Sequence, residues 1–149
     1  MSDTQAERQT IEAIEQAVEK EPFSRALNME LVELRKGFSA VEMVYRPESM
    51  DNIYRRAHGG AIFGLIDEAF ETVCQVGGKI AVALNVNVTY ITSPEPGARL
   101  RAEAREISET RRTASYDINV TDHDNRLIAS CKALAYRTDK PVVFPKTEQ

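Results

Sequence analysis

The segment from Gly59 to about Val76 constrains the fold of this chain more than any other stretch. Apolar residues cover more of its helical circumference than they would on a helix at a protein surface. The pair Gly77-Gly78 that follows suits a left-handed helix stop. A helix that is apolar on most sides must be covered by other elements. The sequence therefore predicts a long helix buried at the centre of the fold.

The remaining segments predict an α+β order around this helix. Residues 4–20 place Ile11, Ile14 and Val18 on one helical face, and residues 23–27 form a short helical turn. Runs of alternating or β-branched residues predict strands at 29–34, 39–45, 81–91, 100–107, 113–122 and 127–136, with 47–57 as a polar loop. The first two strands flank Lys36-Gly37, which predicts a hairpin. Two strands, a buried helix and four strands indicate one curved antiparallel sheet around a central helix.

Composition sets broad limits on the class of protein. The 149 residues, 42% hydrophobic and 28% charged, predict a single soluble domain over 1–149, with a helical extension at 1–22. Residues 138–149 carry two prolines and predict a surface strap or a disordered tail. A net charge of −4 argues against a nucleic-acid partner.

Targeting signals and cysteine spacing add further expectations. No apolar run has the length of a membrane span, and the N-terminus has no signal-peptide character. Cys74 and Cys131 lack metal-ligand spacing, which favours two buried thiols in a cytoplasmic protein. No His/Cys cluster implies a metal ion.

A His-Gly-Gly turn stands at the start of the apolar helix. Two consecutive glycines, Gly59 and Gly60, let backbone N–H groups approach a ligand. The first N–H groups of a helix also lack internal partners. Asp67, two turns further on, is a carboxylate among apolar residues, where burial costs free energy unless something satisfies the charge. Donors and a carboxylate favour chemistry on an acyl group; the alternative is a structural Asp67 that caps a loop or pairs with an arginine.

The spacing between Gly60 and Asp67 raises a geometric problem. A helix rises about 1.5 Å per residue, so the two positions lie roughly 10 Å apart along the axis. They cannot both touch one carbonyl within a single chain. Either they are unrelated, or a second copy places its helix alongside, antiparallel, and completes the site.

The motif resembles that of the hotdog-fold acyl-CoA thioesterases, in the branch of the phenylacetate-pathway thioesterase and the small human acyl-CoA thioesterases. That family has an Asn six residues before the His and an Asp nine residues after it, within HGGxxxxLxDxA. The resemblance also covers the strand Asn85–Ile91 and extends over roughly residues 25–137. The matching residues are Asn52, His58, Gly59, Gly60, Leu65, Asp67 and Ala69.

The resemblance implies a hotdog fold, at least a homodimer and often a tetramer, and hydrolysis of an acyl-CoA thioester without a separate cofactor. Asp67 inherits the role of base or nucleophile, and the Gly60 N–H, with Gly59 beside it, that of the oxyanion contact. Asn52 would orient the attacking water or the carboxylate. His58 would form a hydrogen bond near the thioester.

Two positions depart from the family pattern. Ala83 stands where some relatives have a serine facing the site, so a hydroxyl contact is missing. Glu71, one turn after Asp67, adds a second carboxylate where close relatives tend to be apolar. We expect a like charge there to raise the pKa of Asp67; the alternative is a solvated helix edge.

Other residues are candidates for substrate contacts. CoA carries phosphates, and Arg111, Arg112 or the pair Arg55 and Arg56 could hold them. The family often places a basic residue where Arg111 stands, although any one of these arginines could simply be solvated. Phe63 is a candidate for the core or the pocket wall.

Two other functions are possible on the same fold. One is a binding module that holds acyl-CoA or a lipid-like ligand without turning it over; an acidic residue in an apolar helix argues against it. The other is a hydratase, but its His-rich pattern is missing. A nucleophile elbow of the Gly-x-Ser-x-Gly kind is also missing, so a serine hydrolase has no support.

Overall fold

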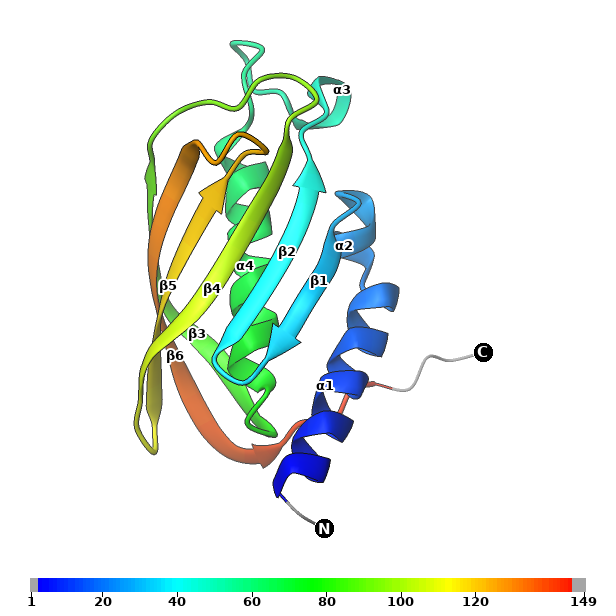
Figure 1. Cartoon of the computed structure of the whole chain (residues 1–149), viewed down its shortest axis with the longest axis vertical. Helices are drawn as coiled ribbons and strands as arrows, with labels where there is room; N and C mark the ends of the chain where they lie inside the picture. The colour runs from blue at the N-terminus through cyan, green and yellow to red at the C-terminus, as the bar shows by residue number, and fades with distance from the viewer. Residues whose placement is uncertain (1–2, 146–149) are drawn as a thin grey trace.

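The computed structural model describes residues 3–145, which form one six-stranded antiparallel sheet and four helices. The strands lie in the order β1-β2-β4-β5-β6-β3, and the sheet curves around the long helix α4 (Figure 1). This confirms the expected hotdog architecture. The bounds are α1 Asp3–Lys20, α2 Pro22–Ala26, β1 Glu30–Arg35, β2 Phe38–Val44, α3 Pro47–Met50, α4 Gly59–Gln75, β3 Lys79–Tyr90, β4 Arg99–Glu109, β5 Thr113–Thr121 and β6 Leu127–Pro141.

The first hairpin forms where the sequence predicts it. β1 and β2 pair antiparallel, and their connection ends at Gly37, whose φ of +72° is readily adopted only by glycine. β2 then pairs with β4 across the sheet. The stop after α4 is also confirmed, because Gly78 has a φ of +77°.

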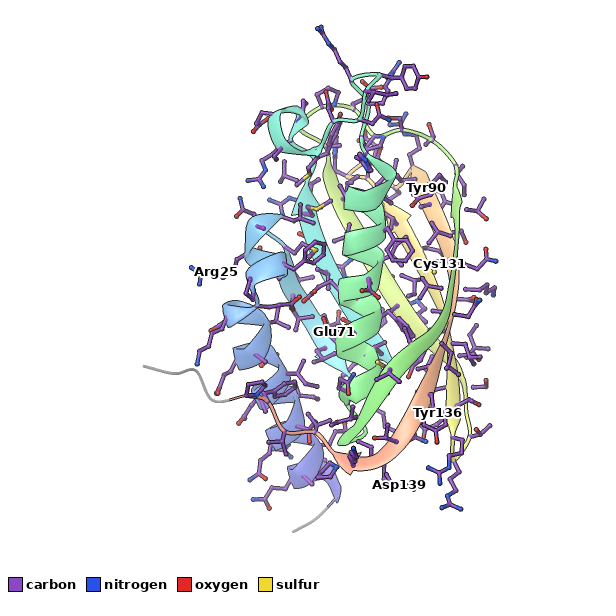
Figure 2. The ribbon with its side chains drawn as sticks, turned by 180° about the vertical axis from the view of Figure 1, so that it is seen from behind. Arg25, Glu71, Tyr90, Cys131, Tyr136 and Asp139 are labelled. Carbon is purple, nitrogen blue, oxygen red and sulfur yellow. The ribbon has the colours of Figure 1, made fainter. Side chains whose placement is uncertain are left out.

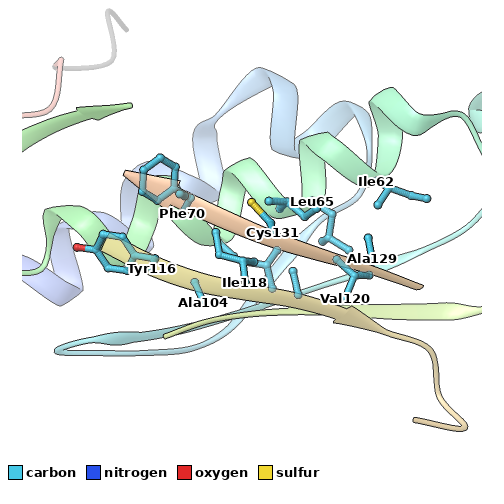
Figure 3. Packing of buried hydrophobic residues seen from close by; sticks show 14 of the residues in the cluster. Ile62, Leu65, Phe70, Ala104, Tyr116, Ile118, Val120, Ala129 and Cys131 are labelled. Carbon is cyan, nitrogen blue, oxygen red and sulfur yellow. The ribbon is translucent and has the colours of Figure 1, made fainter. Parts of the chain in front are cut away.

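α4 packs against the concave face of the sheet and supplies much of the core. Figure 3 shows Leu65 and Phe70 of this helix against side chains of β5 and β6. The Phe70 and Tyr116 rings meet edge to face, with centroids 5.5 Å apart. A buried hydrogen bond of 2.7 Å joins the hydroxyls of Ser39 on β2 and Thr72 on α4. The predicted central helix is therefore the element around which the sheet closes.

The N-terminal helices pack along one side of α4. Ile14 of α1 is buried with Leu34 and Val76. α2 lies directly over Gly64, since a Cβ added there would lie 3.0 Å from Cζ of Phe23 and 3.2 Å from Cδ1 of Leu27. The missing side chain at position 64 thus lets α2 approach α4 closely.

Two predicted segments differ from the structure. The polar loop at 47–57 contains the short helix α3, which begins at Pro47, a residue suited to the first helical turn. The tail expected from Thr138 instead continues β6 to Pro141, because this stretch pairs with the start of β3 at Lys79. The last four residues of that tail, 146–149, lie outside the described residues.

The cysteine prediction is confirmed. Cys74 and Cys131 are both buried free thiols. Among residues 3–145, none of the helices is both long and apolar enough to cross a membrane.

Candidate active site

The N-terminus of α4 is capped by the side chain of His58. Its Nδ1 accepts a hydrogen bond of 2.8 Å from the backbone N–H of Gly60. A ring nitrogen that accepts a hydrogen bond carries no proton, so the neutral imidazole is the capping form. The Gly59 N–H forms no hydrogen bond with another described residue. The His-Gly-Gly turn therefore presents two adjacent donors, one of them held by the protein's own imidazole.

Tyr90 fixes the other side of this turn. Its hydroxyl donates a hydrogen bond of 3.0 Å to the carbonyl oxygen of Gly59, which links the end of β3 to the start of α4. Figure 2 shows Tyr90 beside the first turns of the helix. A Cβ on Gly59 would lie 3.2 Å from the Tyr90 ring, so the glycine allows this close contact. From the sequence alone we expect Tyr90 only in the core or the pocket wall, and nothing local signals this long-range contact.

Asp67 lies on the face of α4 that points away from the sheet. Phe63, Asp67 and Glu71 follow one another at intervals of four residues, and all three are partly or fully accessible in the single chain. Burial raises the pKa of the Asp67 carboxyl above its usual range. A carboxylate with a raised pKa holds a proton more readily, which suits a general base.

Glu71 is not the cause of the raised pKa of Asp67, contrary to the expectation from the sequence. Burial is the cause of the raised pKa of Asp67, and the repulsion between the two carboxylates instead appears at Glu71. Burial first, and then the charges of Glu21 and Asp67, raise the pKa of Glu71 to about 7. Glu21, the residue between α1 and α2, has a carboxylate oxygen within 4.8 Å of one from Glu71. The sequence does not reveal this approach.

Glu68 is the functional candidate that the sequence did not single out. Its residue is only 2% exposed. Burial first, and then the nearby carboxylate of Glu21, raise its pKa to about 9. A helical-wheel reading could have found it, because position 68 is one turn after Gly64, the point at which α2 packs on α4.

Asn52 organises the loop before α4. Its side-chain oxygen accepts hydrogen bonds from the backbone N–H groups of Tyr54, at 2.8 Å, and Arg56, at 3.2 Å. The loop lies at the start of α4 (Figure 1), whereas Asp67 is nine residues beyond His58, about 13 Å along the helix. The structure does not bring Asn52 to Asp67 within one chain.

The expected CoA contacts lie at both ends of α4: Arg55 and Arg56 belong to the loop just before the His-Gly-Gly turn, whereas Arg111 and Arg112 lie far from it. Arg111 and Arg112 form the turn between β4 and β5, at the end of the molecule opposite the start of α4 (Figure 1). Arg112 pairs with Asp139 at 2.9 Å, whereas Arg111 makes no ion pair with any residue in the range 3–145. Ala83 lies on β3 two residues after the buried Ala81, and is exposed in the single chain.

The structure keeps Gly60 and Asp67 as far apart as the sequence predicts. α4 is a single helix from Gly59 to Gln75, so the rise per residue still places the donor and the carboxylate roughly 10 Å apart. One chain thus presents the donors and the carboxylate on the same helix, but not around one reacting atom.

A curved antiparallel sheet around a long helix with these groups on it defines a hotdog-fold enzyme. The model of the thioesterase superfamily matches residues 54–129. The "Putative esterase" of Archaeoglobus fulgidus is 37% identical over 81% of this chain and 77% of its own length. This chain belongs to the thioesterase superfamily and is a thioester hydrolase.

Solved structures place it in the phenylacetate-pathway-like branch. The acyl-coenzyme A thioesterase PaaI of Escherichia coli is 26% identical over 80% of this chain and 84% of its own. The structure of that protein, from the phenylacetic acid degradation operon, has a TM-score of 0.85 and 25% identity over 95% of this chain and all of PaaI (100%). A Streptococcus mutans protein solved with acetyl CoA is 30% identical, with a TM-score of 0.72 over 77% of this chain and 92% of its own.

Proposed function

We propose that this protein hydrolyses acyl-CoA thioesters to CoA and a carboxylic acid. The E. coli relative is named an acyl-CoA thioesterase, and the S. mutans relative binds acetyl CoA. The observation that carries the proposal is the position of Asp67: a carboxylate with a raised pKa on the open face of a helix whose N-terminus supplies backbone donors.

In the proposed reaction, the Gly60 N–H binds the thioester carbonyl oxygen as negative charge develops on it. One such donor contributes typically about 3 kcal/mol. Asp67 either removes a proton from the attacking water, or attacks the carbonyl to form a mixed anhydride that water then cleaves. In both routes the carbonyl carbon loses the thiolate of CoA.

The two remaining motif residues have supporting roles in this proposal. His58 is exposed, so its imidazole can turn away from the Gly60 N–H when the substrate carbonyl arrives and form a hydrogen bond beside the thioester. The oxygen of Asn52 is occupied by the loop backbone, which leaves its NH₂ group to orient the water or the carboxylate.

We infer that two chains share each site. Within residues 3–145, β3 pairs only with β6 and so forms one edge of the sheet. Along and just beyond this edge strand, Val82, Leu84 and Ile91 are 49%, 57% and 50% exposed. A long strand edge with apolar side chains is a template for pairing with another strand. A second copy joined there by a two-fold axis would run its α4 antiparallel and place its Gly60 opposite Asp67.

The same dimer would explain the position of Arg111. The start of α4 from the partner would lie toward the end of the sheet at which the β4–β5 turn stands. Arg111 could then bind a CoA phosphate while the thioester reaches Asp67. Ala83 and the partner's Gly59 would line the path between these two points, and Phe63, one helical turn before Asp67, would lie beyond it.

A thiol-release assay over a panel of acyl-CoAs tests the proposal. We expect release of free CoA from at least one aromatic, short or medium-chain substrate, and loss of that release in Asp67→Asn. Tight binding of acyl-CoA without any thiol release would instead support the non-catalytic binding module.

A further inference from the structure

We propose that Glu21, Glu68 and Glu71 form a binding site for a hard divalent cation such as Ca²⁺. Each residue offers one carboxylate oxygen, and the three oxygens all lie within 4.8 Å of one another. The site is separate from the thioester chemistry of Asp67 and His58. It therefore stands or falls independently of the proposed function.

The fold assembles this cluster from two helices. Glu21 is the residue that precedes α2, and Glu68 and Glu71 lie on successive turns of α4. The close approach of α2 over Gly64 sets the distance between them. Figure 2 shows Glu71 on α4, with α1 and α2 beside it. Glu68 and Glu71 are therefore held by one helix, and Glu21 by the one-residue connection between α1 and α2.

Glu68 supplies the observation that points to a ligand. It is 2% exposed, and its Oε1 is buried without a hydrogen-bond partner among the described residues. None of the three carboxylates forms an ion pair with a Lys, Arg or His in the range 3–145. A buried, unpaired carboxylate is costly, and coordination of a metal ion is one of the few ways to satisfy it.

The ligand atoms indicate the kind of ion. Two ligands on opposite sides of one ion are separated by twice the metal–oxygen distance, which is about 4.6–5.2 Å for Ca²⁺. Three oxygens within 4.8 Å of one another can therefore share one such ion. An all-oxygen, carboxylate-only set favours hard cations such as Ca²⁺ and Mn²⁺ over Zn²⁺ or Cu²⁺.

An ion could reach the cluster through an adjacent groove. The groove has a volume of about 1060 Å³, and Glu21 and Glu71 both line it. The rest of its wall comes from α1, α4, β3, Pro22 and residues 142–145. It is open to solvent, so water molecules can complete the coordination that three carboxylates leave unfilled.

The competing occupant is a proton. A protonated Glu68 could donate a hydrogen bond to Glu21 and reduce the crowding of negative charge without any ion. Both occupants would satisfy the same oxygens, so the test must separate them by direct measurement of the ion.

The test measures cation binding by the full-length protein after treatment with EDTA and removal of the chelator. Titration calorimetry with Ca²⁺, and electron paramagnetic resonance with Mn²⁺, report binding without reference to activity. The variants are Glu68→Gln and Glu71→Gln, and the matched control is Glu12→Gln on the exposed face of α1. Far-UV circular dichroism checks folding; Glu71 is exposed, so its variant remains informative if Glu68→Gln does not fold.

We expect one ion per chain in the wild type and in Glu12→Gln, and binding at least about 10-fold weaker in both cluster variants, because affinity follows the number of charged ligands. Saturating Ca²⁺ should also raise the Tm of the wild type, but not that of the cluster variants. Absence of stoichiometric binding in the wild type, or equal binding in all four proteins, would overturn the proposal. A higher Tm of Glu68→Gln without any ion binding to the wild type would assign the cluster to a shared proton instead.

Discussion

The Nδ1 atom of His58 accepts a hydrogen bond of 2.8 Å from the Gly60 N–H, the same group that the motif assigns to the substrate. In the proposed mechanism, the helix cap and the oxyanion contact use the same N–H. The imidazole caps the helix N-terminus and would have to leave when a thioester carbonyl binds. We therefore expect helix stability and catalysis to be coupled at this residue pair.

Substitution of His58 separates the two roles. His58→Ala should lower the free energy of unfolding by about 1 kcal/mol, because the helix loses its cap. His58→Asn, which can cap through its side-chain oxygen, should recover most of that stability but not the activity lost in His58→Ala. Urea unfolding and thiol release measure the two effects. Full recovery of activity in His58→Asn would show that His58 acts only as the helix cap.

Asp67→Asn should reduce kcat at least about 100-fold with little change in KM. The carboxylate acts mainly in the transition state, and loss of such an interaction lowers kcat and kcat/KM together. Asp117→Asn is the matched control and should remain active, because this residue alternates with the buried Tyr116 and Ile118 and so lies on the face of β5 opposite α4. Normal turnover by a folded Asp67→Asn protein would exclude Asp67 from the mechanism and leave Glu68 or Glu71 to be tested as the catalytic carboxylate.

Complementation tests whether two chains share a site. Asp67→Ala removes the carboxylate, and Gly60→Pro removes the N–H at a position in the first helical turn, where proline is tolerated. Refolded together, heterodimers hold one intact and one doubly damaged site. Random mixing then restores about a quarter of the wild-type activity. A mixture that contains heterodimers but stays inactive would exclude the shared site.

Arg111→Ala should raise KM for acyl-CoA, and most strongly at low ionic strength, where screening of the phosphate charge is weak. Activity on a short thioester without the nucleotide part should not change. Arg112→Ala is the comparison, because Arg112 already pairs with Asp139 and should affect KM less. An equal loss on both substrates would show that Arg111 acts on structure alone.

Stability in the presence of EDTA should fall as the pH rises from about 4.5 to about 9. Burial raises the pKa of Glu68 from 4.5 to about 9, so between these values the folded state binds more protons than the unfolded chain. The free energy of unfolding then decreases with pH. Glu71, with a pKa of about 7, adds to the same trend.

Glu68→Gln should reduce the loss of unfolding free energy between pH 5 and pH 8.5 by at least about 1 kcal/mol, because one pKa unit corresponds to about 1.4 kcal/mol. Urea unfolding at pH 5, 7 and 8.5, at a fixed protein concentration, measures the difference. Parallel curves for the wild type and Glu68→Gln would contradict a proton held by Glu68 in the folded state.

Local sequence signals determined most of the fold. The apolar circumference of residues 59–76 predicted α4, glycines predicted the hairpin turn at Gly37 and the helix stop at Gly78, and alternation predicted six strands. These features depend on neighbours within a few residues, so they can be read from the chain. The continuation of β6 through Thr138 could not, because it depends on pairing with Lys79, about sixty residues away.

The candidate site, like the fold, could be predicted from the sequence only in part. The HGG turn and Asp67 follow from a motif of fixed spacing on one helix, and the rise of that helix alone predicts that one chain cannot complete the site. The sequence could not reveal the contact of Tyr90 with Gly59, or the meeting of Glu21 with Glu68 and Glu71. Those pairs come from different elements. Only the packing of α2 and β3 against α4 sets their distances and their burial.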